Sequence, residues 1–165
     1  MSTRSPRTRI PALISKAGAT CALTTAAVAA TALVPVMSAE AQAATQAKPA
    51  PAKTALKVAA SKKGAPYRWG ATGPNAFDCS GLTQYSYKKA GKKLPRTAAS
   101  QYNKTRHISR GSRKAGDLVF FHSGSNVYHV GIYAGKGKIW HSPKPGKSVR
   151  LEKIWTSQVW YGRVR

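Results

Sequence analysis

The sequence predicts an α+β domain in which helices precede a run of antiparallel strands. Apolar residues recur at helical spacing only in the first half of the presumed domain, up to about residue 104. From residue 117 onwards, short apolar segments of strand length take over, and Gly, Ser, Asn and Pro separate them. This change of period along the chain is the main evidence for the fold class.

Residues 1–43 are predicted to be a secretory signal peptide. Four basic residues precede an apolar, alanine-rich stretch at 17–37, and small residues at 39–44 offer a cleavage site near Ala43. A membrane anchor is the alternative, but Pro35 and the lack of a basic stop after the stretch favour removal. We therefore expect an exported protein that is secreted or associated with the cell wall.

Residues 44–53 read as a flexible Pro/Ala/Lys linker, and 54–165 as one domain with a single core. Without the signal, Cys79 is the only cysteine, so no internal disulfide can form. An unpaired thiol in an exported protein is either a buried small hydrophobe or a reactive group. Composition alone leaves both interpretations open.

The net charge is +24, and loss of the signal would leave about +21. Such a charge indicates a polyanionic partner. For an exported protein, anionic wall polymers or membrane surfaces fit better than nucleic acid, for which no binding motif is visible. A merely solubilising basic surface is the alternative. We expect a monomer.

The elements follow in order along the chain. Thr54 is expected to cap a first helix that ends at Gly64, and a shorter helix is expected over 97–104. Five strands are predicted at 117–121, 130–134, 138–141, 149–153 and 160–164.

A second helix is predicted to begin at Cys79. Asp78 is a good N-cap, and Phe77 and Leu82 have the spacing of a hydrophobic staple. At the first helical position, free N–H groups and the helix dipole favour a thiolate, and the same donors can serve an oxyanion. Tyr67 could add a phenolic donor, although a packed loop aromatic is an equally good interpretation.

His129 and His141 can meet across a hairpin. If 135–137 is a three-residue loop, Gly131 lies opposite His141, and His129 is diagonal to His141 on the same face. His129 could then take the thiol proton while His141 orients its ring. A two-residue loop would place the histidines on opposite faces and break this scheme.

Other chemistries fit poorly. The histidine spacings and single cysteine argue against a zinc site, so no metal and no cofactor are expected. The few scattered carboxylates argue against a glycosidase, and no nucleophile elbow or phosphate loop is present. His107 and His122 lack any spacing argument and are left out of the site.

The chain resembles the NlpC-type family of bacterial cell-wall cysteine peptidases from about Leu56 to its C-terminus. The resemblance rests on six segments: Gly64–Gly70, Gly73–Leu82, Leu94–Thr97, Gly116–Phe121, His129–Tyr133 and the later His141. It implies a papain-like fold, with the cysteine at a helix start packed on a small antiparallel sheet. Ala71 and Ala115 depart from the family pattern, outside the presumed chemistry.

The resemblance also implies roles and a substrate. By position, Cys79 matches the nucleophile, His129 the base and His141 the polar third member of the catalytic site. Tyr67 resembles a residue near the oxyanion site, and Asp78 and Ser80 flank the nucleophile where relatives shape the substrate pocket.

The expected function is a secreted cysteine endopeptidase that cuts peptidoglycan stem peptides through an acyl-thioenzyme. Relatives often cut between D-glutamate and diaminopimelate or lysine. The alternatives are a catalytically silent wall- or polyanion-binding protein on the same fold, and a related amidase or acyltransferase.

Overall fold

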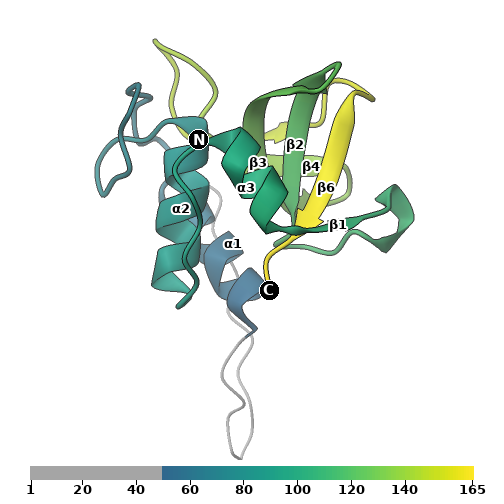
Figure 1. Cartoon of the computed structure of the whole chain (residues 1–165). Helices are drawn as coiled ribbons and strands as arrows, with labels where there is room; N and C mark the ends of the chain where they lie inside the picture. Colours follow the sequence, from purple (N-terminus) through teal and green to yellow (C-terminus); the bar gives the residue numbers. More distant parts are fainter. Residues whose placement is uncertain (1–49) are drawn as a thin grey trace, which may run out of the picture. The chain divides into compact units, whose positions relative to one another are not determined.

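The computed structural model describes residues 50–165, which form three helices and one antiparallel sheet of six strands (Figure 1). The helices are α1 (Pro51–Ser61), α2 (Cys79–Lys89) and α3 (Ala98–Lys104), with a short 3₁₀ helix at Arg110–Ser112. The strands are β1 (Arg106–Ile108), β2 (Leu118–Ser123), β3 (Asn126–Gly135), β4 (Lys138–His141), β5 (Arg150–Lys153) and β6 (Val159–Arg163). The predicted α+β class is confirmed.

The predicted signal peptide and the first part of the predicted linker, residues 44–49, lie outside the described residues. In the part that is described, no helix is long and apolar enough to cross a membrane.

The first helix begins earlier than the sequence predicted. Pro51 is its first residue and Ala50 its N-cap, so Thr54 lies inside the helix and does not cap it. Proline suits this position because its fixed φ is already helical and its missing N–H would have no partner there. Residues 51–53, expected to be linker, are therefore the first turn of α1.

The sheet order is β1-β6-β2-β3-β4-β5, with every neighbouring pair antiparallel. The five predicted strands are all present. Strand β1 was missed because it is three residues long and two of them, Arg106 and His107, are exposed, so no apolar alternation marks it. It extends the sheet by pairing with β6.

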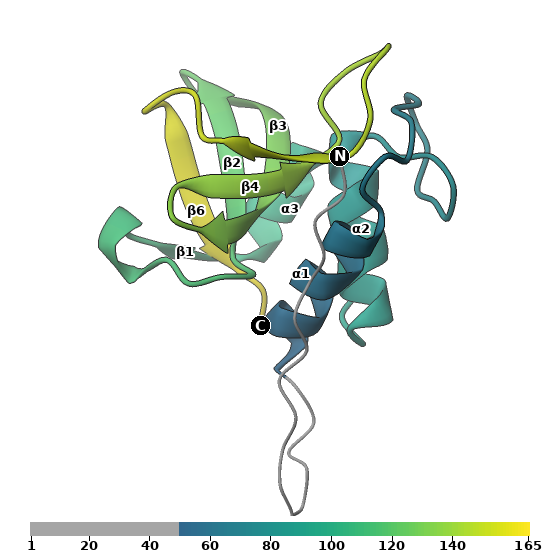
Figure 2. The ribbon, with the colours of Figure 1, turned by 180° about the vertical axis from the view of Figure 1, so that it is seen from behind.

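The two faces of the sheet bury separate apolar clusters. Along β2, Leu118 and Phe120 pack into the cluster shared with the helices, whereas Val119 and Phe121 pack into a second cluster on the opposite face. The continuous apolar run of β2 is thus explained by burial on both faces. Figures 1 and 2 show the three helices gathered beside the curved sheet.

The β3–β4 hairpin reaches the predicted register by a different route. Gly135 pairs with Lys138, so the loop has two residues, Lys136 and Gly137, both with positive φ. The ladder then shifts between Tyr133 and Gly135. This bulge adds the residue that the short loop lacks. The predicted three-residue loop was therefore wrong, but the strand pairing beyond the bulge is the predicted one.

Gly81 lets the first turn of α2 pack against the preceding loop. A Cβ atom there would lie 2.1 Å from the carbonyl oxygen of Ala71 and 3.0 Å from Oδ1 of Asp78. The same Ala71 carbonyl accepts a hydrogen bond from the Asp78 N–H at 3.0 Å. Because the nearest obstacle is backbone, the loop would have to move to admit a methyl group.

We predict that Gly81→Ala lowers the free energy of unfolding by about 1–3 kcal/mol, the usual cost of overpacking. Gly111→Ala is the matched control, since a Cβ atom at Gly111 meets nothing within 4 Å. Its effect should stay within about 0.5 kcal/mol. Urea denaturation followed by circular dichroism measures both, and equal stabilities of the two variants would contradict the prediction.

Candidate active site

Cys79 is the first residue of α2, as the sequence predicted. Asp78 is the N-cap, and its Oδ1 accepts a hydrogen bond from the Gly81 N–H at 2.7 Å. Its Oδ2 accepts a second hydrogen bond from the Gly70 N–H at 3.0 Å, which fixes the upstream loop against the helix start. Phe77 and Leu82, the predicted staple, are both fully buried in the core beneath this turn.

Arg96 joins the two residues that flank the cysteine. Its guanidinium forms an ion pair with both carboxylate oxygens of Asp78, and its Nη1 donates to Ser80 Oγ at 2.9 Å. Asp78 and Ser80 are buried, while the Arg96 side chain is 38% exposed. Sequence reasoning gave Arg96 no role, although it lies in the Leu94–Thr97 motif that helped to identify the family resemblance.

A groove of about 500 Å³ runs past the cysteine. Its lining residues come from the loop between α1 and α2, the α2 start, the α3 start and the beginning of β3: Trp69, Asp78, Cys79, Ser80, Arg96, Thr97, Ala98, Ala99, Val127 and Tyr128. Trp69 and Tyr128 are largely exposed at its rim. The groove is thus open to solvent and holds the predicted nucleophile together with both of its predicted flanking residues.

Tyr67 lies beside this group. It forms an isolated bridge with Phe77, two residues before the cysteine. Burial raises the pKa of Tyr67, the charges of Cys79 and Asp78 raise it further, and Arg96 lowers it. A phenol with a raised pKa keeps its proton and can donate a hydrogen bond.

His129 and His141 meet across the β3–β4 hairpin as the register predicted. Their Nε2 and Nδ1 atoms, respectively, are 2.8 Å apart, and both side chains are buried. Gly131 makes room for this pair, because a Cβ atom there would lie 3.2 Å from Cβ of His141. The hairpin therefore brings together the two histidines that sequence reasoning selected.

Glu152 extends the pair into a chain of three. Its Oε2 lies 3.0 Å from Nε2 of His141 and accepts a hydrogen bond from Nε of Arg150 at 2.7 Å. Sequence reasoning missed Glu152. A signal was present: an acid two residues after Arg150 shares its face of the predicted strand, next to the strand that ends at His141.

The carboxylate at one end determines which nitrogens carry protons. Arg150 holds the pKa of Glu152 below its usual value, so Glu152 is an acceptor. His141 must then present Nε2–H to Glu152 and an unprotonated Nδ1 to His129. His129 in turn donates through Nε2–H, which leaves its Nδ1 with a lone pair able to accept a proton.

Burial keeps both rings neutral. It lowers the pKa of His129 to about 3, and the neighbouring His141 contributes to the shift while Glu152 opposes it. Burial also lowers the pKa of His141, against the raising effect of its hydrogen bond to Glu152. A neutral imidazole with a free lone pair is the form that a general base requires.

The pKa of the Cys79 thiol differs from the prediction. Burial raises the pKa of Cys79, the backbone N–H of Val130 lowers it by hydrogen bonding to the sulfur, and the Asp78 charge raises it. The expected thiolate is therefore not the favoured resting form, because the loss of hydration outweighs the donors at the helix start. The Cys79 sulfur accepts a hydrogen bond from the backbone N–H of Val130, the residue after His129. The His129 ring is itself hydrogen-bonded to His141.

The two remaining histidines of the described residues lie elsewhere. His107 stacks on Tyr102, and His122 stacks on Trp160 with its Nδ1 2.9 Å from the Gly124 carbonyl oxygen. Within residues 50–165, no group of three His, Cys, Asp or Glu side chains is arranged to hold a metal ion. His129, His141 and Glu152 form a linear chain of hydrogen bonds.

Two curated relatives illustrate the similarity to known proteins. A "Probable endopeptidase" of Corynebacterium glutamicum (strain R) is 44% identical over 133 residues, which are 81% of this chain and 57% of the relative. The "Bifunctional muramidase/DL-endopeptidase CwlT" of Bacillus subtilis (strain 168) is 47% identical over 98 residues, 57% of this chain and 30% of that protein. The chain thus matches little more than half of the first relative and less of the second.

Solved structures and the family model agree with these relatives. The NlpC/p60 domain of the peptidoglycan hydrolase SagA superposes with a TM-score of 0.63 and 34% identity, over 68% of this chain and 98% of that domain. The model of the NlpC/P60 family matches residues 64–164, most of the described domain and all of the groove and histidine chain. The chain belongs to the NlpC/P60 family.

Proposed function

We propose that this protein is an exported cysteine endopeptidase that hydrolyses amide bonds in peptidoglycan stem peptides. The proposal rests above all on the chain from Glu152 through His141 to His129, which leaves a proton acceptor on the strand beside the sulfur of Cys79. The endopeptidase names of the relatives and the peptidoglycan hydrolase named among the solved structures support the substrate class.

In the proposed reaction, Nδ1 of His129 takes the Cys79 proton as the sulfur attacks the amide carbonyl carbon. The Cys79 N–H and the Tyr67 hydroxyl stabilise the resulting oxyanion. The carbon–nitrogen bond then breaks, and the leaving amine receives the proton from His129. Water, deprotonated by His129, attacks the thioester and releases a carboxylic acid and the thiol. Glu152 stabilises the transient positive charge through His141.

The acyl half of the substrate would lie in the groove with Cys79, where Asp78, Ser80 and Arg96 form one wall. Tyr128 lines both this groove and a neighbouring cavity of about 360 Å³ that His129 and His141 also line. The leaving half would extend past Tyr128 into that cavity. We propose D-γ-glutamyl-diaminopimelate or -lysine as the bond, in keeping with the DL-endopeptidase name of one relative.

We predict that Cys79→Ala abolishes the hydrolysis of purified muropeptides, because Cys79 carries the only thiol within residues 50–165. Mass spectrometry of wild-type and variant digests identifies the products and the bond that is cut. Ser86→Ala, on the same helix but outside the groove, is a control that keeps the thiol. Identical cleavage products from the wild type and Cys79→Ala would contradict the nucleophile assignment. The absence of products from both would favour a catalytically silent wall-binding protein.

We predict that Glu152→Gln lowers kcat by at least about tenfold with little change in KM, because a neutral amide neither determines the imidazole tautomers nor stabilises imidazolium. Steady-state kinetics on a soluble muropeptide measures the effect. Lys153→Gln, the exposed neighbour on β5, should leave kcat unchanged. A variant with raised KM and normal kcat would show that Glu152 serves binding only.

The pH profile of the wild type tests the same arrangement. Burial disfavours the protonated imidazole, so His129 should stay neutral as the pH falls below 6.5, its usual pKa, toward about 3. We therefore expect the acid limb of kcat/KM to lie well below pH 6.5, within the range in which the fold persists. An acid limb at the ordinary histidine value would contradict a buried neutral base.

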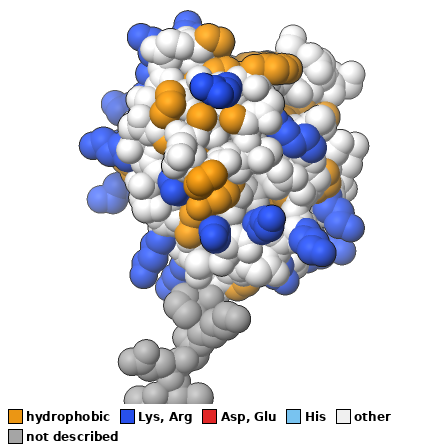
Figure 3. Space-filling view, turned by 90° about the vertical axis from the view of Figure 1, so that its left-hand side faces the viewer, with side chains coloured by type: hydrophobic (Ala, Val, Ile, Leu, Met, Phe, Trp, Pro, Cys, Tyr) orange, Lys and Arg blue, Asp and Glu red, His pale blue; other side chains and the backbone are white. Residues whose placement is uncertain are grey.

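We further propose that the basic surface retains the enzyme on anionic wall polymers. Residues 50–165 contain only three acidic side chains, and each is paired with an arginine. Figure 3 shows one face of the molecule with many Lys and Arg side chains and no acidic side chain in view. Sedimentation with isolated cell walls should decrease steeply between about 0.05 and 0.5 M salt. Retention that is independent of salt would rule out this mechanism.

A further inference from the structure

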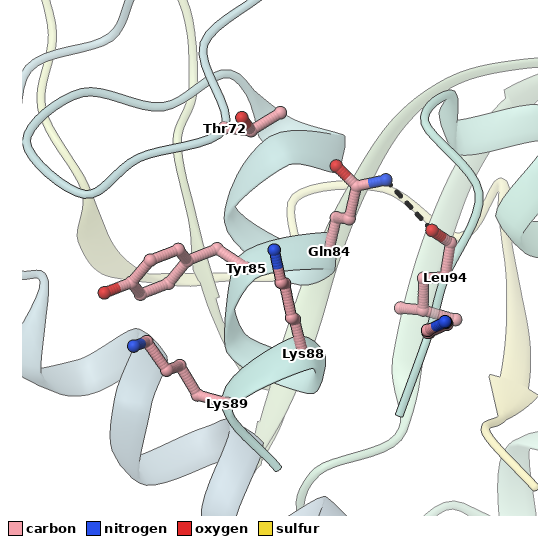
Figure 4. A pocket seen from close by; sticks show the side chains of 7 residues that line it. Thr72, Gln84, Tyr85, Lys88, Lys89 and Leu94 are labelled. Atoms are coloured by element: carbon pink, nitrogen blue, oxygen red, sulfur yellow. Dashed lines mark hydrogen bonds between the residues drawn. The ribbon is translucent and has the colours of Figure 1, made fainter. Parts of the chain in front are cut away.

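A cavity of about 610 Å³ lies along α2, away from the groove that holds Cys79. Its lining residues are Thr72, Gln84, Tyr85, Lys88, Lys89, Lys93 and Leu94 (Figure 4), and we call it the lysine pocket. None of them lines the catalytic groove or the cavity beside the histidines. The pocket therefore has no part in the reaction proposed above.

The lysine pocket concentrates positive charge with no acid to balance it. Lys88, Lys89 and Lys93 contribute three ammonium groups, and no carboxylate lines the cavity. The carboxylates of residues 50–165 are held by Arg96, Arg150 and Arg163, so the lysines of this part of the chain have no carboxylate partner. Three like charges in one concavity repel one another, and an anionic ligand would relieve that repulsion.

Two further groups give the lysine pocket a defined shape. Tyr85 is held by an edge-on contact with Phe77, at 5.3 Å between ring centroids. The ammonium groups of Lys62 and Lys89 lie 5.2 and 5.6 Å from the centre of the Tyr85 ring. Gln84 is tied to the Leu94 carbonyl at 2.9 Å, which fixes α2 against the opposite wall, as Figure 4 shows.

We propose that the lysine pocket binds a phosphodiester group of an anionic, polyol-based wall polymer. The inference rests on the proposed wall location and gives the basic surface a specific site. The pocket offers ammonium groups and no guanidinium, so it would hold an anion through point charges and not through a bidentate fork. Lysine acts as a compact point charge, which suits a phosphate oxygen.

The same geometry disfavours nucleic acid, the other common phosphodiester polymer. Binding of single strands without sequence preference relies on open aromatic faces on which bases stack. Tyr85, the one aromatic residue of the pocket, already has its ring in contact with two lysines and Phe77. A flexible polyol backbone needs no such surface.

The position of the lysine pocket suits simultaneous binding of polymer and substrate. Lys88 follows Cys79 by nine residues of the same helix, a rise of roughly 13 Å along the axis. A polymer chain held there would leave the groove open for a stem peptide. Binding at the pocket would then raise the local concentration of the enzyme at the wall without competing with catalysis.

Charge-matched variants of the full chain test the proposal. The pocket variant replaces all three lysines of the pocket: Lys88→Gln, Lys89→Gln and Lys93→Gln. The control variant has the same net charge and replaces three exposed lysines elsewhere: Lys114→Gln, Lys138→Gln and Lys153→Gln. Both are made in the Cys79→Ala background. Binding of poly(glycerol phosphate) is measured by calorimetry at 0.15 M salt, with single-stranded DNA of equal phosphate number as the second probe.

We expect the pocket variant to bind poly(glycerol phosphate) about tenfold more weakly than the Cys79→Ala parent and the control variant less than about threefold more weakly. Equal losses in both variants would overturn the proposal, because net charge would then explain binding. Tighter, pocket-dependent binding of DNA would overturn the ligand assignment.

Activity on a soluble muropeptide, measured with Cys79 intact, separates this inference from the proposed function. The pocket variant should keep wild-type kcat/KM because no pocket residue lines the catalytic groove. Unchanged hydrolysis together with unchanged polymer binding would refute the lysine pocket alone. Failure of the wild type to hydrolyse any muropeptide would refute the enzyme and leave the binding result to be judged separately.

Discussion

The register of the β3–β4 hairpin is the constraint on which the candidate site depends. Successive residues of a strand face opposite sides of a sheet, so a slip of one residue would move His129 away from His141. The two-residue loop by itself would cause that slip, and the bulge between Tyr133 and Gly135 corrects it. The 2.8 Å contact between the rings is therefore a consequence of one extra residue in β3.

A second pairing completes the chain of polar groups. Strand β5 lies next to β4 with Arg150 opposite His141 and Glu152 opposite Ile139. Glu152 on β5 is thus diagonal to His141 on the same face of the sheet. His129, on the strand at the opposite edge of β4, is diagonal to His141 in the same way. Two diagonal contacts across three neighbouring strands align carboxylate, imidazole and imidazole. No loop residue is needed to hold them, which suits a site that must keep its geometry during a reaction.

Burial then determines the protonation of this chain. A thiolate–imidazolium pair at rest would place two charges where hydration is poor, and the pKa of each partner moves in the direction that avoids this. The only ionised member of the histidine chain is Glu152, at its most exposed end and paired with Arg150. Charge would develop at Cys79 and His129 only during the attack on a carbonyl, when the helix-start donors and Glu152 can stabilise it.

The sequence was most informative where structure is local. The Asp78 cap and the start of α2 at Cys79 follow from short-range patterns, and both are confirmed. The helix predicted over 97–104 is present as α3, with Thr97 as its N-cap. Short apolar segments separated by Gly, Ser, Asn and Pro likewise revealed the five longer strands. The strand pairing at His141 was predicted correctly from a wrong loop, because the bulge is invisible in residue types.

Features that depend on distant partners were missed. Arg96 acquires its role from Asp78 and Ser80, and Glu152 from His141, and each pair meets only in the folded chain. The direction of the Cys79 pKa was also wrong, since a helix start predicts a lower value and only the packed structure reveals the burial that raises it. The start of α1 shows a similar limit, because Pro51 and Thr54 are both residues that favour a helix start and the helix begins at the proline.

The scarcity of acids links the candidate site to the basic surface. Asp78, Asp117 and Glu152 are each bound by an arginine, and two of these three pairs belong to the candidate site. The planar guanidinium can hold a carboxylate at two points, as Arg96 holds Asp78 and Arg163 holds Asp117. The lysines of residues 50–165 have no acidic partner and, together with exposed arginines such as Arg106 and Arg110, supply the outward-facing charge. Lysines can therefore be removed from the surface without disturbing the arginine–carboxylate pairs of the candidate site. The proposed retention on the wall and the proposed catalysis can thus be tested by separate mutations.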